Sequence, residues 1–306
     1  MSKWLAIAAL ACAGVSQGAE LARPKAGKTE IFPLNDIKPG MRATAWTVFA
    51  GTEPEPVPVE IVGVWKNFLG PKLDVILGKM GGKAKETGVA AGMSGSPVYI
   101  DGKLIGALSY RMGQFSPDAV CGITPIESML EIQQFDTSRP SDAKNPVERA
   151  AASASAVTPI ETPMAFSGFA ASTLRQYQPL FESMGVTAVQ GGSSASLLST
   201  EPAPGWETSL NPGEAISGIL ISGDMSATGM GTVTYNDGKR VLAFGHPFYN
   251  LGPIDMPMAK SEILMTFSSA SAPTKFGSAT QVVGALRQDR FSGIMGELGA
   301  EAPSIP

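Results

Sequence analysis

The stretch GMSGSPVYIDGKLIGALSY, residues 92–110, predicts a β-hairpin directly after a serine that lies between glycines. Its two apolar runs are rich in Val, Ile and Tyr, which favours strands, and Asp101 and Gly102 join them. Glycine supplies the positive φ that such a tight turn needs. Gly92 and Gly95 let the backbone turn sharply, so the N–H groups of Gly92 and Ser94 can converge on one point.

The residues around this hairpin indicate a β domain over 36–135, where short apolar segments alternate with Gly, Pro and Asp turns. The segment PVPVEIVGVW, residues 56–65, has β-branched residues at strand spacing. A short helix is expected in TPIESMLEI, residues 124–132. There Thr124 can cap the helix, Pro125 suits the first helical position, and Glu127 completes a capping box.

The composition of residues 136–210 predicts a linker followed by an irregular or helical insert. The part up to residue 160 is small and polar, with prolines and no periodicity. Residues 172–185 predict a short helix that is broken or kinked at Pro179. The β pattern resumes over 211–306, where GTVTYNDGKRVLAFGHPF, residues 231–248, predicts a second hairpin whose outgoing strand ends at Gly245-His246. The predicted fold class is all-β, with a few short helices.

Charge and composition exclude several classes of partner and cofactor. The formal net charge is −4 and no dense run of Lys or Arg occurs, so neither nucleic acid nor an anionic lipid surface is an expected partner. The chain has one histidine and two cysteines, of which Cys12 lies in the leader described below. Cys121 alone cannot form an internal disulfide, and one His with one Cys is too few ligands for a structural zinc. We expect no metal and no cofactor.

Residues 1–19 resemble a secretory signal peptide, with one lysine, an apolar run and small residues at the end. A lipoprotein anchor at Cys12 is the alternative, but Ala-Leu-Ala before it makes a poor lipobox. The expected destination is the periplasm, the cell envelope or the medium, and any membrane association would be peripheral.

Ser94 and His246 are the candidate catalytic pair. A serine hydroxyl is a weak nucleophile, so it needs a base within hydrogen-bond reach and donors aimed at the developing oxyanion. The imidazole of His246 can supply the base, and the backbone N–H groups of Gly92 and Ser94 can supply the donors. A serine in an ordinary glycine-rich loop and a histidine packed for structural reasons are the competing interpretations. The residues by themselves leave both open.

Two segments resemble a known peptidase family. GMSGSPVYIDGKLIGALSY followed by VCGITPIESML is similar to the nucleophile region of trypsin-like serine peptidases, and more closely to the sporulation factor IV B peptidases, family S55. NPGEAISGILISGDMSATGMGTVTYNDGKRVLAFGHPF is similar to the stretch of that family that holds its catalytic histidine. The matches cover roughly residues 38–135 and 211–295. In the family the histidine half comes first, so this chain resembles a permuted order.

The resemblance implies a trypsin-like double β-barrel and a secreted serine endopeptidase, with a protein or peptide as substrate. Ser94 would be the nucleophile, His246 the base, and Gly92 and Ser94 the oxyanion donors. Residues 108–111, LSYR, would be the edge strand that pairs with substrate backbone, and residues 86–93 would form one wall of the primary specificity pocket. The small side chains of that wall predict a small or apolar residue at the cleavage position.

Two departures from the family leave a rival hypothesis open. The aspartate expected before the nucleophile falls near Lys79, so Asp74, Glu86 and Asp255 are substitutes by sequence only, and a dyad is an alternative. The family's PDZ module is not recognisable. The rival is a catalytically inactive secreted protein that binds extended peptides by strand addition. The ending GELGAEAPSIP is abrupt, which is consistent with a longer parent protein.

Overall fold

The computed structural model describes residues 21–113, 116, 118–142, 157–191 and 201–305. The predicted signal peptide, including Cys12, and part of the predicted linker lie outside these ranges. Among the described residues, no helix is long and apolar enough to cross a bilayer.

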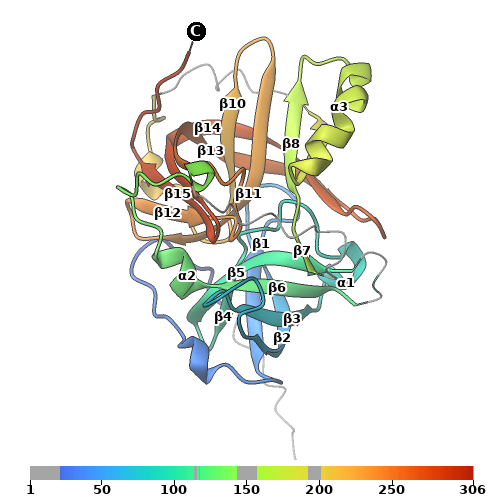
Figure 1. Ribbon diagram of the computed structural model, residues 1–306, viewed down its shortest axis with the longest axis vertical. Helices are drawn as coiled ribbons and strands as arrows, with labels where there is room; N and C mark the ends of the chain where they lie inside the picture. Colours follow the sequence, from blue (N-terminus) through green and yellow to red (C-terminus); the bar gives the residue numbers. More distant parts are fainter. Residues whose placement is uncertain (1–20, 114–115, 117, 143–156, 192–200, 306) are drawn as a thin grey trace, which may run out of the picture.

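The first half forms a closed six-stranded antiparallel barrel, the lower part of the molecule in Figure 1. Its strands run in the order β4-β1-β2-β3-β6-β5, and β5 pairs back to β4 to close the ring. The hairpin predicted at residues 97–110 is present, with Asp101 and Gly102 both at positive φ in the turn. The strands are β1 (Arg42–Thr47), β2 (Glu55–Trp65), β3 (Val75–Met80), β4 (Pro97–Ile100), β5 (Lys103–Met112) and β6 (Val120–Pro125).

The second half forms another antiparallel ring, in the order β10-β13-β14-β15-β12-β11 with β11 paired back to β10. The expected predominantly β, double-barrel architecture is thus confirmed. The long β13–β14 hairpin reaches toward the first barrel, where Gly51 pairs with Ile263. The strands are β10 (Ala215–Ile221), β11 (Ser226–Asn236), β12 (Arg240–Ala243), β13 (Gly252–Phe267), β14 (Thr274–Arg290) and β15 (Gly293–Leu298).

Residues 136–210 contain more regular structure than the sequence indicates. Strand β7 (Val157–Pro159) joins the first sheet at β5, and β8 (Thr162–Ser167) joins the second sheet at β11. Strand β9 (Val186–Gln190) lies parallel to β8, with α3 (Ala171–Ser183) as the connection between them. Helix α3 continues through Pro179 and does not break there. These short strands have no alternating pattern in the sequence. Their pairing depends on the neighbouring strands of the two sheets more than on their own side chains.

The start of helix α2 (Ile126–Leu130) differs from the capping that the sequence predicts. The capping box expected at Thr124 and Glu127 does not form, and the N-cap is Pro125. Instead, the Thr124 hydroxyl donates to the Gly245 carbonyl of the other barrel at 2.6 Å, while Glu127 accepts from the Leu34 N–H. A contact between the barrels has therefore replaced the local cap. The other helical segments within the described ranges are α1 (Ala84–Thr87) and the 3₁₀ turns Leu34–Asp36, Pro140–Asp142 and Trp206–Thr208.

A buried apolar cluster joins the two barrels. Ile126, Met129 and Ile132, on and after α2, pack with Leu242 and Met295 of the second barrel. On another part of the interface, Val48 packs with residues of β10, β11 and β13. The crevice between the barrels is therefore a packed interface, and the candidate site lies within it.

Candidate active site

The turn that carries Ser94 depends on two glycines in the left-handed region, Gly92 (φ 88°) and Gly95 (φ 94°). A Cβ on Gly95 would lie 1.9 Å from the Thr232 carbonyl oxygen and 2.5 Å from the Phe244 nitrogen, both in the second barrel. The Gly95 N–H donates to the Leu108 carbonyl on β5 at 2.7 Å. Only glycine can therefore occupy this position, and the turn is held by both barrels.

Ser94 differs from the other buried serines nearby. Ser94, Ser96 and Ser109 are all completely buried. The Ser96 hydroxyl donates to the Met93 carbonyl at 2.6 Å, and the Ser109 hydroxyl donates to the Ala107 carbonyl at 2.8 Å. The Ser94 Oγ has no hydrogen-bond partner among the described residues. Buried hydroxyls are rarely left without a partner, so this one is an exception that calls for a functional explanation.

The backbone N–H groups of the two predicted oxyanion donors make no hydrogen bond among the described residues. Within the described ranges, the N–H groups of Gly92 and Ser94 donate to no other group. The carbonyls of the same two residues are engaged by Thr232, whose N–H donates to the Ser94 oxygen at 2.8 Å and whose hydroxyl donates to the Gly92 oxygen at 2.9 Å. The turn is thus fixed through its carbonyls, and neither N–H group is used to hold it.

His246 lies in the loop after β12, with 3% of its surface exposed. Phe244 and Gly245 before it are both at φ 69°, and a Cβ on Gly245 would lie 2.1 Å from the Ser109 Oγ of the first barrel. The His246 Nδ1 lies 2.8 Å from the Pro247 carbonyl oxygen. A carbonyl can only accept, so Nδ1 carries a proton in this contact, and in the neutral imidazole Nε2 is then the acceptor. That tautomer is the one a general base needs.

The structure brings the two predicted residues to the same interface. The Ser94 turn contacts Thr232 and Phe244, and the Phe244 N–H donates to the Thr232 carbonyl at 3.3 Å. On the other side, the Gly245 carbonyl accepts from Thr124 of the first barrel. Ser94 and His246 are not hydrogen-bonded to each other, since the Ser94 hydroxyl has no partner among the described residues. Proton transfer between them requires a side-chain movement.

The three acidic residues suggested from sequence are engaged elsewhere. Asp74 accepts from the Asn67 N–H at 2.7 Å and pairs with Lys66, and Asp255 pairs with Arg287. Glu86 lies on α1 and lines the cavity described below. Within the described residues, the hydrogen-bond contact seen for the imidazole is with the Pro247 carbonyl and not with any of these three carboxylates.

Asp289, which sequence reasoning missed, holds the loop that follows His246. Its carboxylate accepts from the N–H groups of Phe248 at 2.8 Å, Tyr249 at 2.7 Å and Leu251 at 3.2 Å. Burial raises the pKa of the Asp289 carboxyl, and these N–H donors oppose the shift. Asp289 is 43 residues from His246 in the sequence, and no motif marks it.

Lys275 is a second buried residue near the site that no sequence motif marks. It is 1% exposed, and its Nζ donates to the hydroxyls of Thr47 at 2.7 Å and Thr232 at 3.5 Å. Its stem lies against the nucleophile turn, because a Cβ on Gly92 would be 3.3 Å from two carbons of the Lys275 side chain. Burial lowers the pKa of Lys275 to about 7.

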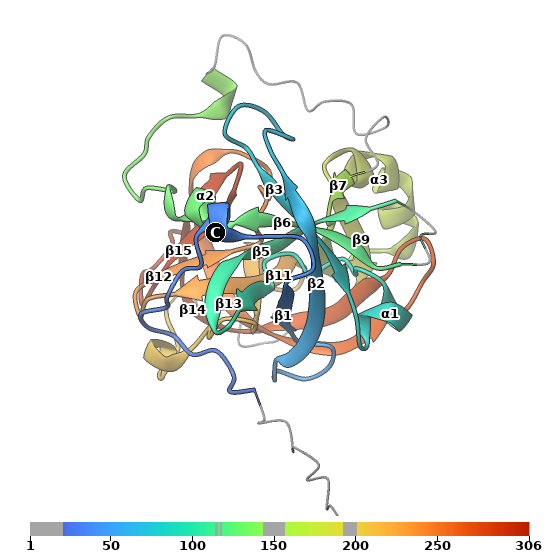
Figure 2. The same cartoon turned by 90° about the horizontal axis from the view of Figure 1, so that it is seen from below.

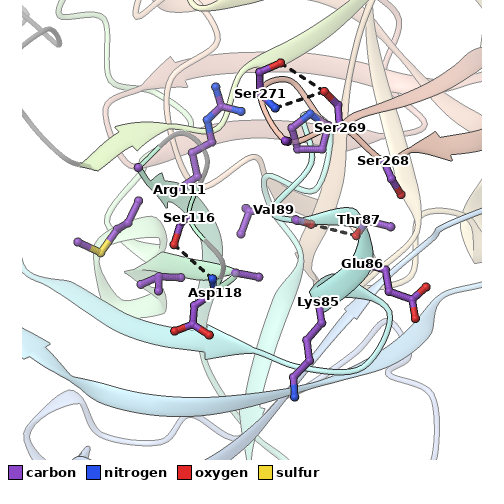
Figure 3. A pocket seen from close by; sticks show the side chains of 17 residues that line it. Lys85, Glu86, Thr87, Val89, Arg111, Ser116, Asp118, Ser268, Ser269 and Ser271 are labelled. Carbon is purple, nitrogen blue, oxygen red and sulfur yellow. Dashed lines mark hydrogen bonds between the residues drawn. The ribbon is translucent and has the colours of Figure 1, made fainter.

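A cavity of about 390 Å³ lies beside the segment that leads into the Ser94 turn. Figure 3 shows it between α1, the β5–β6 connection and the turn of the β13–β14 hairpin. Residues Glu86 to Val89 of the predicted pocket wall line it, as do Arg111 and three serines of the hairpin turn. Ala90, Ala91 and Met93 of the same wall are buried instead. The lining is more polar than the small side chains of the wall indicate.

The predicted substrate-pairing strand, residues 108–111, is part of β5 and is already paired. Strand β7 pairs antiparallel with Tyr110–Met112, and the Ile160 N–H donates to the Ser109 carbonyl at 2.9 Å. In Figure 1, β7 lies beside β5 and β6 where the two barrels meet.

Neither a metal-binding cluster nor a reactive thiol is found among the described residues. They contain no group of three or more His, Cys, Asp or Glu side chains placed to hold a metal. Cys121 is buried, and its burial raises the pKa of the thiol to about 12. Such a thiol is unreactive at neutral pH.

Comparison of the chain with protein-family models, with curated proteins and with solved structures finds no match.

Proposed function

We propose that this protein is an exported serine endopeptidase of the S55 type. Ser94 attacks the scissile carbonyl while His246 Nε2 takes its proton, and the N–H groups of Gly92 and Ser94 bind the oxyanion. His246 then returns the proton to the leaving amine, and water releases the acyl group from Ser94. The chemistry needs no cofactor. Protein or peptide chains are the proposed substrates.

One observation carries this proposal: a buried serine hydroxyl without a hydrogen-bond partner among the described residues, next to two backbone N–H groups that are likewise unengaged. Leaving such groups unpaired costs stability unless a ligand uses them. A purely structural turn would gain from pairing them, as the neighbouring Ser96 does. The nearby loop of the second barrel carries the chain's one histidine.

The test is labelling with a fluorophosphonate probe, with the adduct located by mass spectrometry. We expect wild-type protein to be labelled at Ser94, and Ser94→Ala and His246→Ala each to reduce the rate by about three orders of magnitude or more. Ser96→Ala is the matched control, since Ser96 is equally buried two residues away. It should keep the wild-type rate. The proposal is contradicted if Ser94 is labelled neither in the folded wild type nor in a folded variant whose β7 no longer pairs with β5.

A second candidate function is favoured by the pairing of β7 with β5 and by the absence of a hydrogen bond from Ser94 to His246. It is a secreted protein that binds extended peptides at this edge without cleaving them. Binding of a peptide without any labelling of Ser94 would support this function over the peptidase.

A further inference from the structure

The segment Val157–Pro163 follows the course expected of an extended peptide in this site. It pairs antiparallel with β5 through Tyr110↔Pro159, Arg111↔Thr158 and Met112↔Val157. Antiparallel addition to a sheet edge is a general mode by which peptidases and peptide-binding domains hold an extended chain.

The segment approaches the Ser94 turn from Ile160 onward. The Leu108 N–H donates to the Ser96 carbonyl at 2.9 Å, and the next residue of β5, Ser109, accepts from the Ile160 N–H. The chain then continues to Pro163, whose Cγ lies 3.0 Å from where a Cβ on Gly92 would be. The segment thus passes from the β5 edge to one of the two proposed oxyanion donors.

Two side chains of the segment are recognised by the first half of the molecule. Ile160 is completely buried and belongs to the same apolar cluster as Ala90, Met93 and Leu108. Glu161 forms an ion pair with Arg111, and only 27% and 11% of these two side chains are exposed. An apolar residue followed by an acidic one therefore fits the position next to the nucleophile turn.

We propose that Val157–Pro163 lies in the substrate's place, and that the substrates are extended peptides with an aliphatic residue followed by an acidic residue. This inference rests on the proposed function of the site. A substrate binds only when the segment has left β5, so the chain inhibits its own site. The burial of both Ser94 and His246 is consistent with a closed site.

The first test measures binding in a Ser94→Ala background, where no turnover interferes. A fluorescent synthetic peptide AVTPIETP, the sequence of residues 156–163, is titrated against the chain with a second substitution, Ile160→Gly. Because this substitution raises the open fraction, the peptide should bind about tenfold tighter than to Ser94→Ala itself. The matched control is Ile219→Gly, a buried isoleucine of β10 away from β5, which should bind no better than Ser94→Ala. The same peptide with Asp in place of Ile, or Lys in place of Glu, should bind at least about tenfold more weakly.

The second test does not depend on the Ile160 variant folding well. Met112→Cys and Val157→Cys, at directly opposed positions, should form a disulfide that locks β7 onto β5. With Ser94 restored, fluorophosphonate labelling should be slow when the disulfide is formed and should recover with reductant. Labelling that is measurable and equally fast in both states, or peptide binding as weak to Ile160→Gly as to Ile219→Gly, overturns the inference. Peptide binding without labelling in the opened chain rejects the peptidase alone, so the two proposals fail separately.

Discussion

At the scale of single residues, the site contains a buried ionisable side chain, Lys275, whose burial lowers the stability of the folded protein. The ammonium group of Lys275 is buried among hydroxyls, and no carboxylate forms a salt bridge with it in the described part of the chain. Burial without a counter-charge disfavours the charged form, which is why the pKa of Lys275 falls to about 7. The unfolded chain would have the ordinary lysine pKa of about 10.4. Such a cost is tolerated where a buried group has a role, here support of the turn at Gly92.

The lowered pKa of Lys275 predicts how the free energy of unfolding changes with pH. Between about pH 7 and pH 10.4 the unfolded chain holds a proton that the folded chain has lost, so stability rises with pH across this window by up to about 1.4 kcal/mol per pH unit. Below pH 7 the full cost of the buried charge is present. Lys275→Met should remove this pH-dependent gain. Urea titrations of both proteins at pH 6, 8 and 9.5 measure it, and parallel pH profiles would contradict the assignment.

At the scale of elements, hairpins were predictable and the loop after His246 was not. The turn at Asp101-Gly102 follows from two adjacent residues, and in the second hairpin Asp237 accepts from the N–H groups of Lys239 and Arg240. The loop after His246 instead depends on Asp289, which belongs to a different strand. Its three accepted bonds link β14 to the segment that positions the imidazole.

Asp289→Asn should loosen that loop. An amide presents one acceptor oxygen instead of two, so at least one of the N–H groups at Phe248, Tyr249 and Leu251 loses its partner, at a cost of about 1–3 kcal/mol. Because His246 then moves, labelling of Ser94 should slow even where the protein remains folded. Asp255→Asn, the same change at a more exposed carboxylate, is the control and should alter neither measurement appreciably. Unchanged labelling in Asp289→Asn would remove its positioning role.

At the scale of the whole molecule, the two barrels behave as one packed unit because the site is built across their interface. Strands of both barrels and helix α2 contribute to a common buried cluster. Figure 2 views the molecule from below and shows α2 beside β12 and β15 of the second barrel. Backbone bonds such as Thr232 N–H to the Ser94 carbonyl also cross the interface. Separation of the barrels would expose these groups and dismantle the site.

We therefore expect a single cooperative unfolding transition. Leu242→Ala removes a completely buried side chain from the interface cluster and should destabilise both barrels together, by about 2–5 kcal/mol. Leu264→Ala, on a side chain that is 80% exposed, is the control and should have little effect. Calorimetry together with hydrogen exchange in β2 and in β14 reports on both halves. Two separate transitions would show that the interface is weak.

The sequence by itself determined the β class, the two hairpins and the residues of the candidate pair. These features depend on neighbouring residues: glycine before and after Ser94, the Asp-Gly turn, and a histidine at the end of a short strand. Periodicity and turn chemistry are local, so they can be recognised without knowledge of the fold.

Only the tertiary structure decided what surrounds that pair. Asp289, Lys275 and Ile160 come close to the site from β14 and from a segment without periodic pattern. Thr124 and Glu127, expected to cap a helix, bond elsewhere because distant partners compete for the same polar atoms. The physical reason is that such contacts form only when the barrels close and pack against each other, so no local pattern in the chain encodes them.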